Sequence, residues 1–250
     1  MKRQMRKLKG FKMRFRTFLY RTNLVFFVEC VRELRALLFR KSYSQYNEDK
    51  IILQLLSNQK GYYLDIGSGR PISGSNTYAL YRLGWSGTAI DPLLNNARLF
   101  RLFRHRDRFL NAVVGANKQS IEFYEFEQYV YSTFYREAAE YAIIHNQAKL
   151  RKITKIKNHF LDSSDLQKLN HFPSVLSIDC EGADFNILKS IDFSRYRPTI
   201  ICVELFRSQS LDVNQNISAF LLEKNYQLIS STVLNGLFVS GEYILKLRMK

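Results

Sequence analysis

The segment 62–91 constrains the fold more than any other part of the chain. It begins with a short apolar run, Tyr62–Ile66, which has the composition of a buried strand. A glycine turn at Gly67 follows at once, where a residue without Cβ lets the backbone turn tightly. A helical segment comes next, and a second short strand then ends in Asp91. Strand, glycine turn, helix and strand in this order predict one unit of a parallel α/β sheet.

The carboxyl end of the second strand is where such a sheet binds a ligand. An acid there, Asp91, is placed to accept hydrogen bonds from both hydroxyls of a ribose. The turn lacks the third glycine of a dinucleotide fingerprint, and the chain has no GxxxxGK[ST] phosphate loop. Because S-adenosylmethionine has a ribose but no phosphate, these features favour it over a nicotinamide cofactor. A tight turn that binds no ligand is the alternative.

The positive charge of the chain is concentrated at its N-terminus. The net charge is +16, and residues 1–41 hold 13 of the 38 Lys and Arg residues but only Glu29 and Glu33 among the acids. A segment this basic indicates an anionic partner, either a membrane or a nucleic acid. The three cysteines are too few for a disulfide framework, which indicates a reducing cytoplasm.

Apolar side chains recur at helical spacing within the basic segment. The positions are Phe11, Phe15, Phe18 and Leu19. They fall on one helix face, and a basic amphipathic helix of this kind binds anionic membrane surfaces. We therefore expect residues 1–41 to be an extension that lies on a membrane, with a solvated leader or a helix packed on the domain as alternatives. The apolar run Leu24–Val28 is too short to span a bilayer.

Residues 42–250 are expected to form one domain in which strands and helices alternate. Further strands are predicted at 109–114, 120–126, 154–157, 174–178 and 198–203, and helices at 44–57, 93–106, 163–169, 183–191 and 211–224. A hairpin is expected around Asn235-Gly236. This pattern predicts a Rossmann-like, doubly wound, mostly parallel sheet with a C-terminal antiparallel hairpin, as in class I methyltransferases. The irregular segment 128–150 is expected to be a lid-like insertion.

Two of the later strands also end in acids. Asp179 and Glu181 follow the run 174–178, and Glu204 follows 198–203. Methylating a hydroxyl requires removal of its proton, so we expect a carboxylate beside the acceptor, with Asp179 and Glu181 as the best-placed catalytic candidates. The same pair could instead hold a divalent cation or cap the next helix. The histidines and cysteines show no zinc-site spacing.

Taken in order, the short motifs of the chain resemble the FkbM-like methyltransferases. The matching segments are Ser44-Gln45 with Glu48-Asp49, Tyr63–Gly67, Ser75–Thr77 followed by Tyr81, Gly84–Gly87, Ile90–Pro92, Arg106-Asp107, Asn111–Gly115, Ser132-Thr133, Leu176–Gly182, and Arg197-Pro198 with Val203-Glu204. The resemblance implies an S-adenosylmethionine-dependent enzyme that usually methylates oxygen, often on a sugar. It also implies that the cofactor is lined by Asp65, Gly67, Ser75, Asn76 and Asp91. The basic extension lies outside the family's core.

The sequence therefore predicts an O-methyltransferase for a sugar hydroxyl of a glycan or lipid-linked glycan, at the cytoplasmic face of a membrane. One alternative is an RNA or other nucleic-acid methyltransferase tethered by residues 1–41. The near-neutral body and the lack of an Asn/Asp-Pro-Pro-Tyr element for base amino groups count against it. A non-catalytic membrane-associated binding module is the other alternative, and the retained acids argue against it.

Overall fold

A computed structural model describes residues 24–56, 60–114, 121–127, 131–134, 136–156, 158–159, 173–180, 183–205 and 211–249. The chain divides into two compact units. The first, here called the sheet unit, is Phe39–Ile121 with Ile156–Lys250, and the second is Met1–Leu38 with Glu122–Lys155. Every residue of the candidate site lies in the sheet unit.

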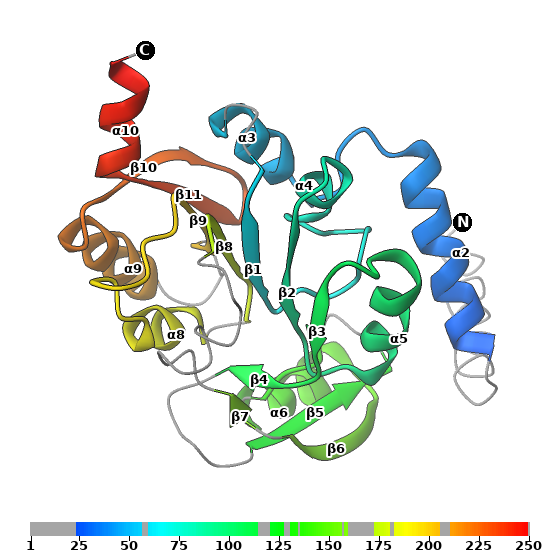
Figure 1. The fold of residues 1–250 in the computed structure, drawn as a ribbon. Helices are drawn as coiled ribbons and strands as arrows, with labels where there is room; N and C mark the ends of the chain where they lie inside the picture. The colour runs from blue at the N-terminus through cyan, green and yellow to red at the C-terminus, as the bar shows by residue number, and fades with distance from the viewer. Residues whose placement is uncertain are drawn as a thin grey trace, which may run out of the picture. The chain divides into compact units, whose positions relative to one another are not determined.

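The sheet unit is built on a seven-stranded sheet with the order β10-β11-β9-β8-β1-β2-β3 (Figure 1). Its strands are β1 (Tyr62–Ile66), β2 (Ser86–Ile90), β3 (Arg108–Leu110), β8 (Val175–Ile178), β9 (Ile200–Glu204), β10 (Tyr226–Ser231) and β11 (Asn235–Ser240). The strands from β3 to β9 pair in parallel, and β11 is antiparallel to both β9 and β10. The prediction of a doubly wound, mostly parallel sheet with a C-terminal antiparallel hairpin is confirmed. The strand order reverses between β1 and β8, which is where such sheets bind ligands.

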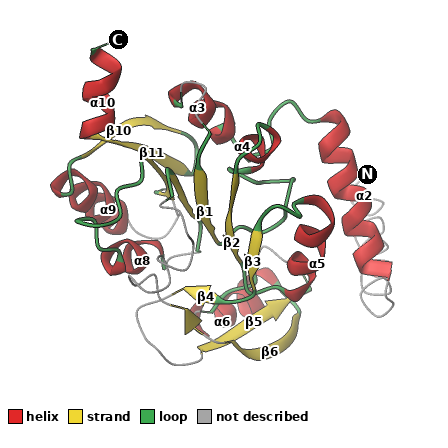
Figure 2. Cartoon of the chain, viewed as in Figure 1, coloured by secondary structure: helices red, strands yellow, loops and turns green. Residues whose placement is uncertain are grey.

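Helices cover the sheet. They are α3 (Glu48–Leu55), α4 (Tyr78–Arg82), α5 (Leu94–Phe103), α8 (Asp184–Ser190), α9 (Leu211–Glu223) and α10 (Gly241–Arg248). Figure 2 shows α8 and α9 on one side of the sheet and α4 and α5 on the other. The strands β8 and β9 are therefore buried on both faces, which explains why they read as continuous apolar runs in the sequence. A short parallel pair, β4 (Val113–Val114) with β7 (Asn158–His159), lies outside the main sheet.

Within its described residues, the second unit contains a separate two-stranded sheet and the helices α2 and α6. Its elements are α2 (Leu24–Phe39), β5 (Ile121–Phe126), α6 (Arg136–Asn146) and β6 (Leu150–Ile156), with the ends of α2, β5 and β6 crossing the unit boundaries. Phe126 packs with three small residues, Ala139, Ala142 and Ala148, in a buried cluster. The helix α6 falls inside the segment 128–150. The role of that segment as a lid stays a prediction.

Several predicted boundaries were wrong for identifiable reasons. The strand expected at 109–114 is divided into β3, which belongs to the main sheet, and β4, which pairs with β7. The helix expected from Ser44 begins only at Glu48. The helix expected at 163–169 lies outside the described residues.

The hairpin turn expected at Asn235-Gly236 is displaced. Both residues lie inside β11, so the chain reverses before them. A Cβ at Gly236 would lie 2.3 Å from the side chain of Leu205. The glycine therefore allows the side chain of Leu205 to pack closely against β11 and does not form a turn. This tertiary contact overrides the local preference of Asn-Gly for a turn.

Candidate functional site

Asp65 lies near the end of β1 and is buried. The Thr77 hydroxyl donates a hydrogen bond of 2.5 Å to its Oδ2 atom. Burial raises the pKa of Asp65 above its usual range, although Arg104 and the hydroxyls of Thr77 and Ser177 favour its carboxylate form. The position of the Asp65 carboxyl group is thus fixed by interactions with other protein side chains.

Gly67 makes the turn that follows β1. Its φ angle is +75°, and a Cβ built there would lie 1.9 Å from the carbonyl oxygen of Asp179. The N–H groups of Gly67 and Ser68 both donate to the carbonyl oxygen of Ile90, at 2.9 and 3.1 Å. The turn therefore joins the ends of β1, β2 and β8, and it needs a residue without a side chain.

Asp91 follows β2 and is also buried. Its Oδ2 atom accepts a hydrogen bond of 3.1 Å from the N–H of Gly69. Its Oδ1 atom accepts bonds of 2.8 Å from the N–H of Leu93 and from Asn96 Nδ2. Burial raises the pKa of Asp91 to about 7, against the opposing effect of these three donors. The carboxyl group is consequently fixed in orientation beside the glycine turn.

Ser75 and Asn76 lie in the loop before α4, where the resemblance placed them. The Ser75 hydroxyl accepts hydrogen bonds from the N–H groups of Tyr78 (3.1 Å) and Thr77 (3.3 Å). It therefore stabilises the turn that leads into α4, whose N-cap residue is Thr77. Asn76 Nδ2 donates to the Ser177 hydroxyl at 3.2 Å, which connects the loop to β8. Both side chains contact protein groups and fix the loop that adjoins the turn.

Arg104 is hydrogen-bonded to several residues of this loop. Sequence reasoning did not identify it. Arginine side chains are mostly exposed in proteins, but Arg104, the residue after α5, is fully buried. Its guanidinium donates to Ser75 Oγ at 3.1 Å, to Thr77 Oγ1 at 3.0 Å and to the carbonyl oxygen of Pro71 at 3.3 Å. Arg104 follows buried Phe100 by one helical turn, and this spacing is the signal that could have identified it.

Asp107 completes the support for Arg104. It accepts a bond of 2.6 Å from Arg104 Nε, and both side chains are fully buried. It also accepts bonds from the Tyr63 hydroxyl at 2.7 Å and from the N–H of Gly87 at 3.0 Å. A buried, hydrogen-bonded network therefore extends from Asp107 through Arg104 to Thr77 and Asp65. Such a network holds a site in one geometry only while every member is satisfied.

The two acids on the other side of β1 come from β8 and β9. The N–H of Asp179, just after β8, donates to Ile66 O at 3.0 Å, and Glu204 is the last residue of β9. Ile178 pairs with Val203 in the sheet, so Asp179 and Glu204 follow one position later on neighbouring parallel strands. Burial raises the pKa of Glu204 to about 8, and the charges of Asp179 and Asp184 add to this effect.

The predicted catalytic residue Glu181 lies outside the described residues. The predicted helix cap can be assessed in part. Asp184, in the first turn of α8, accepts a hydrogen bond of 2.9 Å from the N–H of Cys180. An acid at the start of α8 is therefore supplied by Asp184, which sequence reasoning did not identify.

The polar edge of the sheet continues from Glu204 to Asn235, its partner on β11. Asn235 Nδ2 and the Thr232 hydroxyl donate to Glu48 Oε1, at 3.0 and 2.7 Å, and the N–H of Tyr46 donates to Oε2 at 2.8 Å. Burial raises the pKa of Glu48, but these hydrogen bonds outweigh that effect and lower it overall. The first turn of α3, one of the matching motifs, is thereby attached to the edge of the sheet beside Glu204.

Two buried side-chain atoms at this edge have no hydrogen-bond partner within the part of the chain that the structure describes. They are Ser68 Oγ in the glycine turn and Asn235 Oδ1 at the start of β11. An unpaired buried polar atom is costly unless a ligand satisfies it. Because Ser68 lies between Gly67 and Gly69, beside Asp91, the turn fits a polar, ribose-containing cofactor that approaches the backbone closely.

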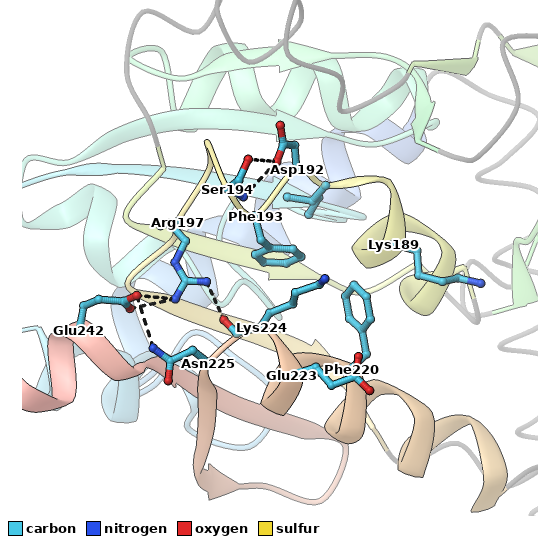
Figure 3. A pocket seen from close by; sticks show the side chains of 11 residues that line it. Lys189, Asp192, Phe193, Ser194, Arg197, Phe220, Glu223, Lys224, Asn225 and Glu242 are labelled. Atoms are coloured by element: carbon cyan, nitrogen blue, oxygen red, sulfur yellow. Dashed lines mark hydrogen bonds and ion pairs between the residues drawn. The ribbon is translucent and has the colours of Figure 1, made fainter.

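A pocket of about 710 Å³ lies at the opposite end of the strands (Figure 3). Arg197, which precedes β9, lines it and binds both carboxylate oxygens of Glu242 at 2.8 and 2.9 Å. Arg197 also donates to the carbonyl oxygen of Lys224 at 2.6 Å. These contacts join the segment before β9 to α9 and α10, and none of the predicted site residues lines this pocket.

No group of three or more His, Cys, Asp or Glu side chains among the described residues is arranged to hold a metal ion. Likewise, none of the helices in the described ranges is long and apolar enough to cross a bilayer.

Comparisons with known proteins identify the family. Residues 65–228, well over half of the chain, match the methyltransferase FkbM domain. No curated protein matched the chain significantly. Among solved structures, the C-terminal domain of precorrin-6Y C5,15-methyltransferase from Rhodobacter capsulatus covers 77% of this chain and 86% of its own, with 13% identity and a TM-score of 0.39. The 1,6-didemethyltoxoflavin-N1-methyltransferase from Burkholderia thailandensis, with bound S-adenosylhomocysteine, covers 77% and 74%, with 13% identity and a TM-score of 0.39. The family match is the stronger finding, and the chain belongs to the FkbM methyltransferases, which makes it an S-adenosylmethionine-dependent enzyme.

Proposed function

We propose that this enzyme methylates a hydroxyl oxygen of a sugar in a glycan or lipid-linked glycan. The observation that carries the proposal is the convergence of acids at one edge of the sheet. Asp91, Asp179 and Glu204 follow or end the neighbouring strands β2, β8 and β9, around the glycine turn of β1. Carboxylates accept hydrogen bonds from hydroxyl groups and can take up their protons, so this edge suits a hydroxyl-rich acceptor.

The cofactor half of the site consists of the residues that the resemblance implied. Asp91 would accept hydrogen bonds from ribose hydroxyls, and Gly67 would allow the cofactor to approach the backbone. Asp65, buried near the end of β1, would lie beneath the bound cofactor. Because Ser75 and Asn76 are bonded to protein groups, we assign them to positioning the loop that borders the cofactor. When bound, S-adenosylmethionine supplies a methyl group activated by its sulfonium.

The acceptor half consists of Asp179 and Glu204, with Glu181 as a further candidate. The acceptor hydroxyl must lose its proton as its oxygen forms the new bond, and a carboxylate within hydrogen-bond reach accepts that proton. Glu204, with its pKa raised to about 8, is a stronger base when ionised than an ordinary carboxylate. A divalent cation held by Asp179 and Glu181 is the alternative, and titration of activity with a chelator checks it.

Calorimetric titration with S-adenosylmethionine tests the cofactor half. We expect Asp91→Ala to lose most of the affinity of the wild type. Asp192→Ala is the matched control, because Asp192 is exposed and lines the pocket at the opposite end of the strands. Undiminished binding by Asp91→Ala would show that the cofactor lies elsewhere.

Mass spectrometry tests the acceptor. Glycans and lipids from cells with and without the gene should differ by the mass of one CH₂ on a sugar. A difference confined to RNA instead would overturn the choice of acceptor while leaving the methyltransferase assignment intact.

We also propose that the enzyme works in the cytoplasm at the inner face of a membrane. The support is the charge of residues 1–41, which hold 13 Lys and Arg residues and two acids. Anionic lipids attract such a segment, and a lipid-linked acceptor would be concentrated at the same surface.

A further inference from the structure

The helix α2 exposes a continuous apolar stripe. Its members are Phe27 (66% exposed), Val31 (39%), Leu34 (46%) and Leu38 (70%). They follow one another at intervals of four, three and four residues, so they lie on one face of the helix. Single exposed apolar residues are common, but a stripe that extends over the length of a helix marks an interaction surface.

The opposite face of α2 carries its buried side chains. Glu33 and Ala36 are buried, and Glu29 is mostly covered and forms an ion pair of 3.2 Å with Arg32. The acids of the helix thus lie away from the stripe. Every α2 side chain described as exposed is apolar except that of Arg35, which lies one turn beyond Val31. The free surface of α2 is therefore apolar and cationic, without an exposed acid.

The chain on either side of α2 has the same charge. Arg40 and Lys41 follow the helix and are exposed. Residues 1–23 precede it and contain nine Lys and Arg residues and no acid. The occupant of the stripe must accordingly accept both apolar side chains and many positive charges.

A second copy of the chain meets only the first requirement. The stripe has the spacing of a coiled-coil seam but extends over about two heptads, whereas a stable coiled coil needs three or four. Pairing would also bring two strongly basic segments together. A nucleic acid meets only the second requirement, because phosphate binding does not use exposed aliphatic side chains.

We infer that α2 lies in the surface of an anionic membrane, with the stripe of Phe27, Val31, Leu34 and Leu38 inserted among the lipid chains. Arg35, Arg40 and Lys41 then lie at the level of the anionic headgroups, as in other interfacial amphipathic helices. This inference rests on the proposed membrane location but not on the methyl-transfer chemistry. It also assigns insertion to α2, whereas the sequence pattern pointed to the apolar residues between Phe11 and Leu19.

Flotation of the full-length protein with lipid vesicles tests the inference. One set of vesicles is pure phosphatidylcholine, and the other contains phosphatidylcholine and phosphatidylglycerol in equal parts. The test variant is Leu34→Gln with Leu38→Gln. The matched control is Leu222→Gln with Leu245→Gln, which changes two leucines that are 66% and 60% exposed on α9 and α10. Because all four leucines are exposed, both variants should fold, and thermal unfolding at the wild-type temperature confirms that they do.

We expect the wild type and the control to float with the anionic vesicles but not with the neutral ones. Each Leu→Gln change on α2 should reduce partition to the anionic vesicles on the order of tenfold. Undiminished flotation of the test variant, or no flotation of the wild type, would overturn the inference. So would a change from dimer to monomer in the test variant by sedimentation, or a loss of RNA binding without a loss of flotation. Absence of S-adenosylmethionine binding in all proteins, with flotation as expected, would instead refute the proposed function alone.

Discussion

The carbonyl oxygen of Asp179 lies where a side chain at Gly67 would have to be. A Cβ at Gly67 would approach this oxygen to 1.9 Å, and the φ angle of +75° is itself unfavourable for any residue with a side chain. The backbone of the turn that we propose to bind the cofactor therefore lies directly against the backbone after β8, which carries a proposed acceptor residue. The two segments can lie this close only because Gly67 has no Cβ.

Gly67→Ala should therefore damage both folding and cofactor binding. The positive φ angle alone costs about 1–2 kcal/mol, and the collision with a backbone atom adds to it because backbone cannot move as freely as a side chain. We expect a loss of at least about 2 kcal/mol in the free energy of unfolding, measured by urea denaturation. Calorimetry should also show weaker S-adenosylmethionine binding.

Gly74→Ala is the matched control for this change. Gly74 also has a positive φ angle, +88°, but a Cβ there would meet no heavy atom within 4 Å. Gly74→Ala should lower the free energy of unfolding only by the cost of the positive φ angle, about 1 kcal/mol. Equal losses at both positions would contradict the close approach of Gly67 to Asp179.

Arg104 should be far more important for stability than its neighbours on α5. Arg104→Met removes the cation that binds buried Asp107 and the guanidinium donors that reach Ser75 and Thr77. Leaving a buried charge uncompensated costs about 3–5 kcal/mol, so thermal unfolding should shift by many degrees. Arg101→Met is the control, because Arg101 is exposed. A small shift with Arg104→Met would mean that the network does not support the loop.

The contrast between Gly67 and Arg104 shows what local sequence can reveal. Tyr62–Ile66, Gly67 and Asp91 were recognisable because strand, turn and terminal acid are neighbours along the chain. The role of Arg104 depends on partners contributed by the loop after β1, which no local pattern brings together. The prediction of a turn at Asn235-Gly236 was wrong for the same reason, since these residues pair with β9 and contact Glu48 and Leu205, which are distant along the chain.

Cofactor affinity should depend on pH through Asp91. Ribose hydroxyls donate to a carboxylate, so the ionised form of Asp91 binds better, and burial raises its pKa to about 7. The affinity for S-adenosylmethionine should therefore increase as pH rises to about 7 and level off above it. Calorimetry from about pH 5 to about pH 9 measures this, and Asp91→Asn should remove the dependence. A wild-type affinity that stays constant across this range would contradict the role of Asp91.

The same shift has the opposite effect on stability. A carboxyl whose folded pKa is raised favours the folded state below its unfolded pKa, and this contribution is lost as pH rises through the folded value. For Asp91 the window runs from about 4 to about 7. Addition of S-adenosylmethionine should restore stability at the upper end of the window, because the cofactor binds only the folded protein. Thermal unfolding with and without the cofactor separates the two effects.

The rate of methyl transfer should depend on pH through the ionisation of Glu204. Its pKa is raised to about 8 by burial and by Asp179 and Asp184, so a base at this position becomes active only as pH rises through about 8. We expect kcat to increase across that range and Glu204→Gln to lose about 10²–10⁴-fold in rate, together with the pH-dependent rise. Asp179→Asn provides a second variant, because removing its negative charge should lower the pKa of Glu204 and move the rise to lower pH. Binding of S-adenosylmethionine should be unchanged by Glu204→Gln, which separates loss of the base from loss of the cofactor. If the rise in kcat persists in Glu204→Gln, the proton is taken by another group, and Glu181 becomes the residue to replace next.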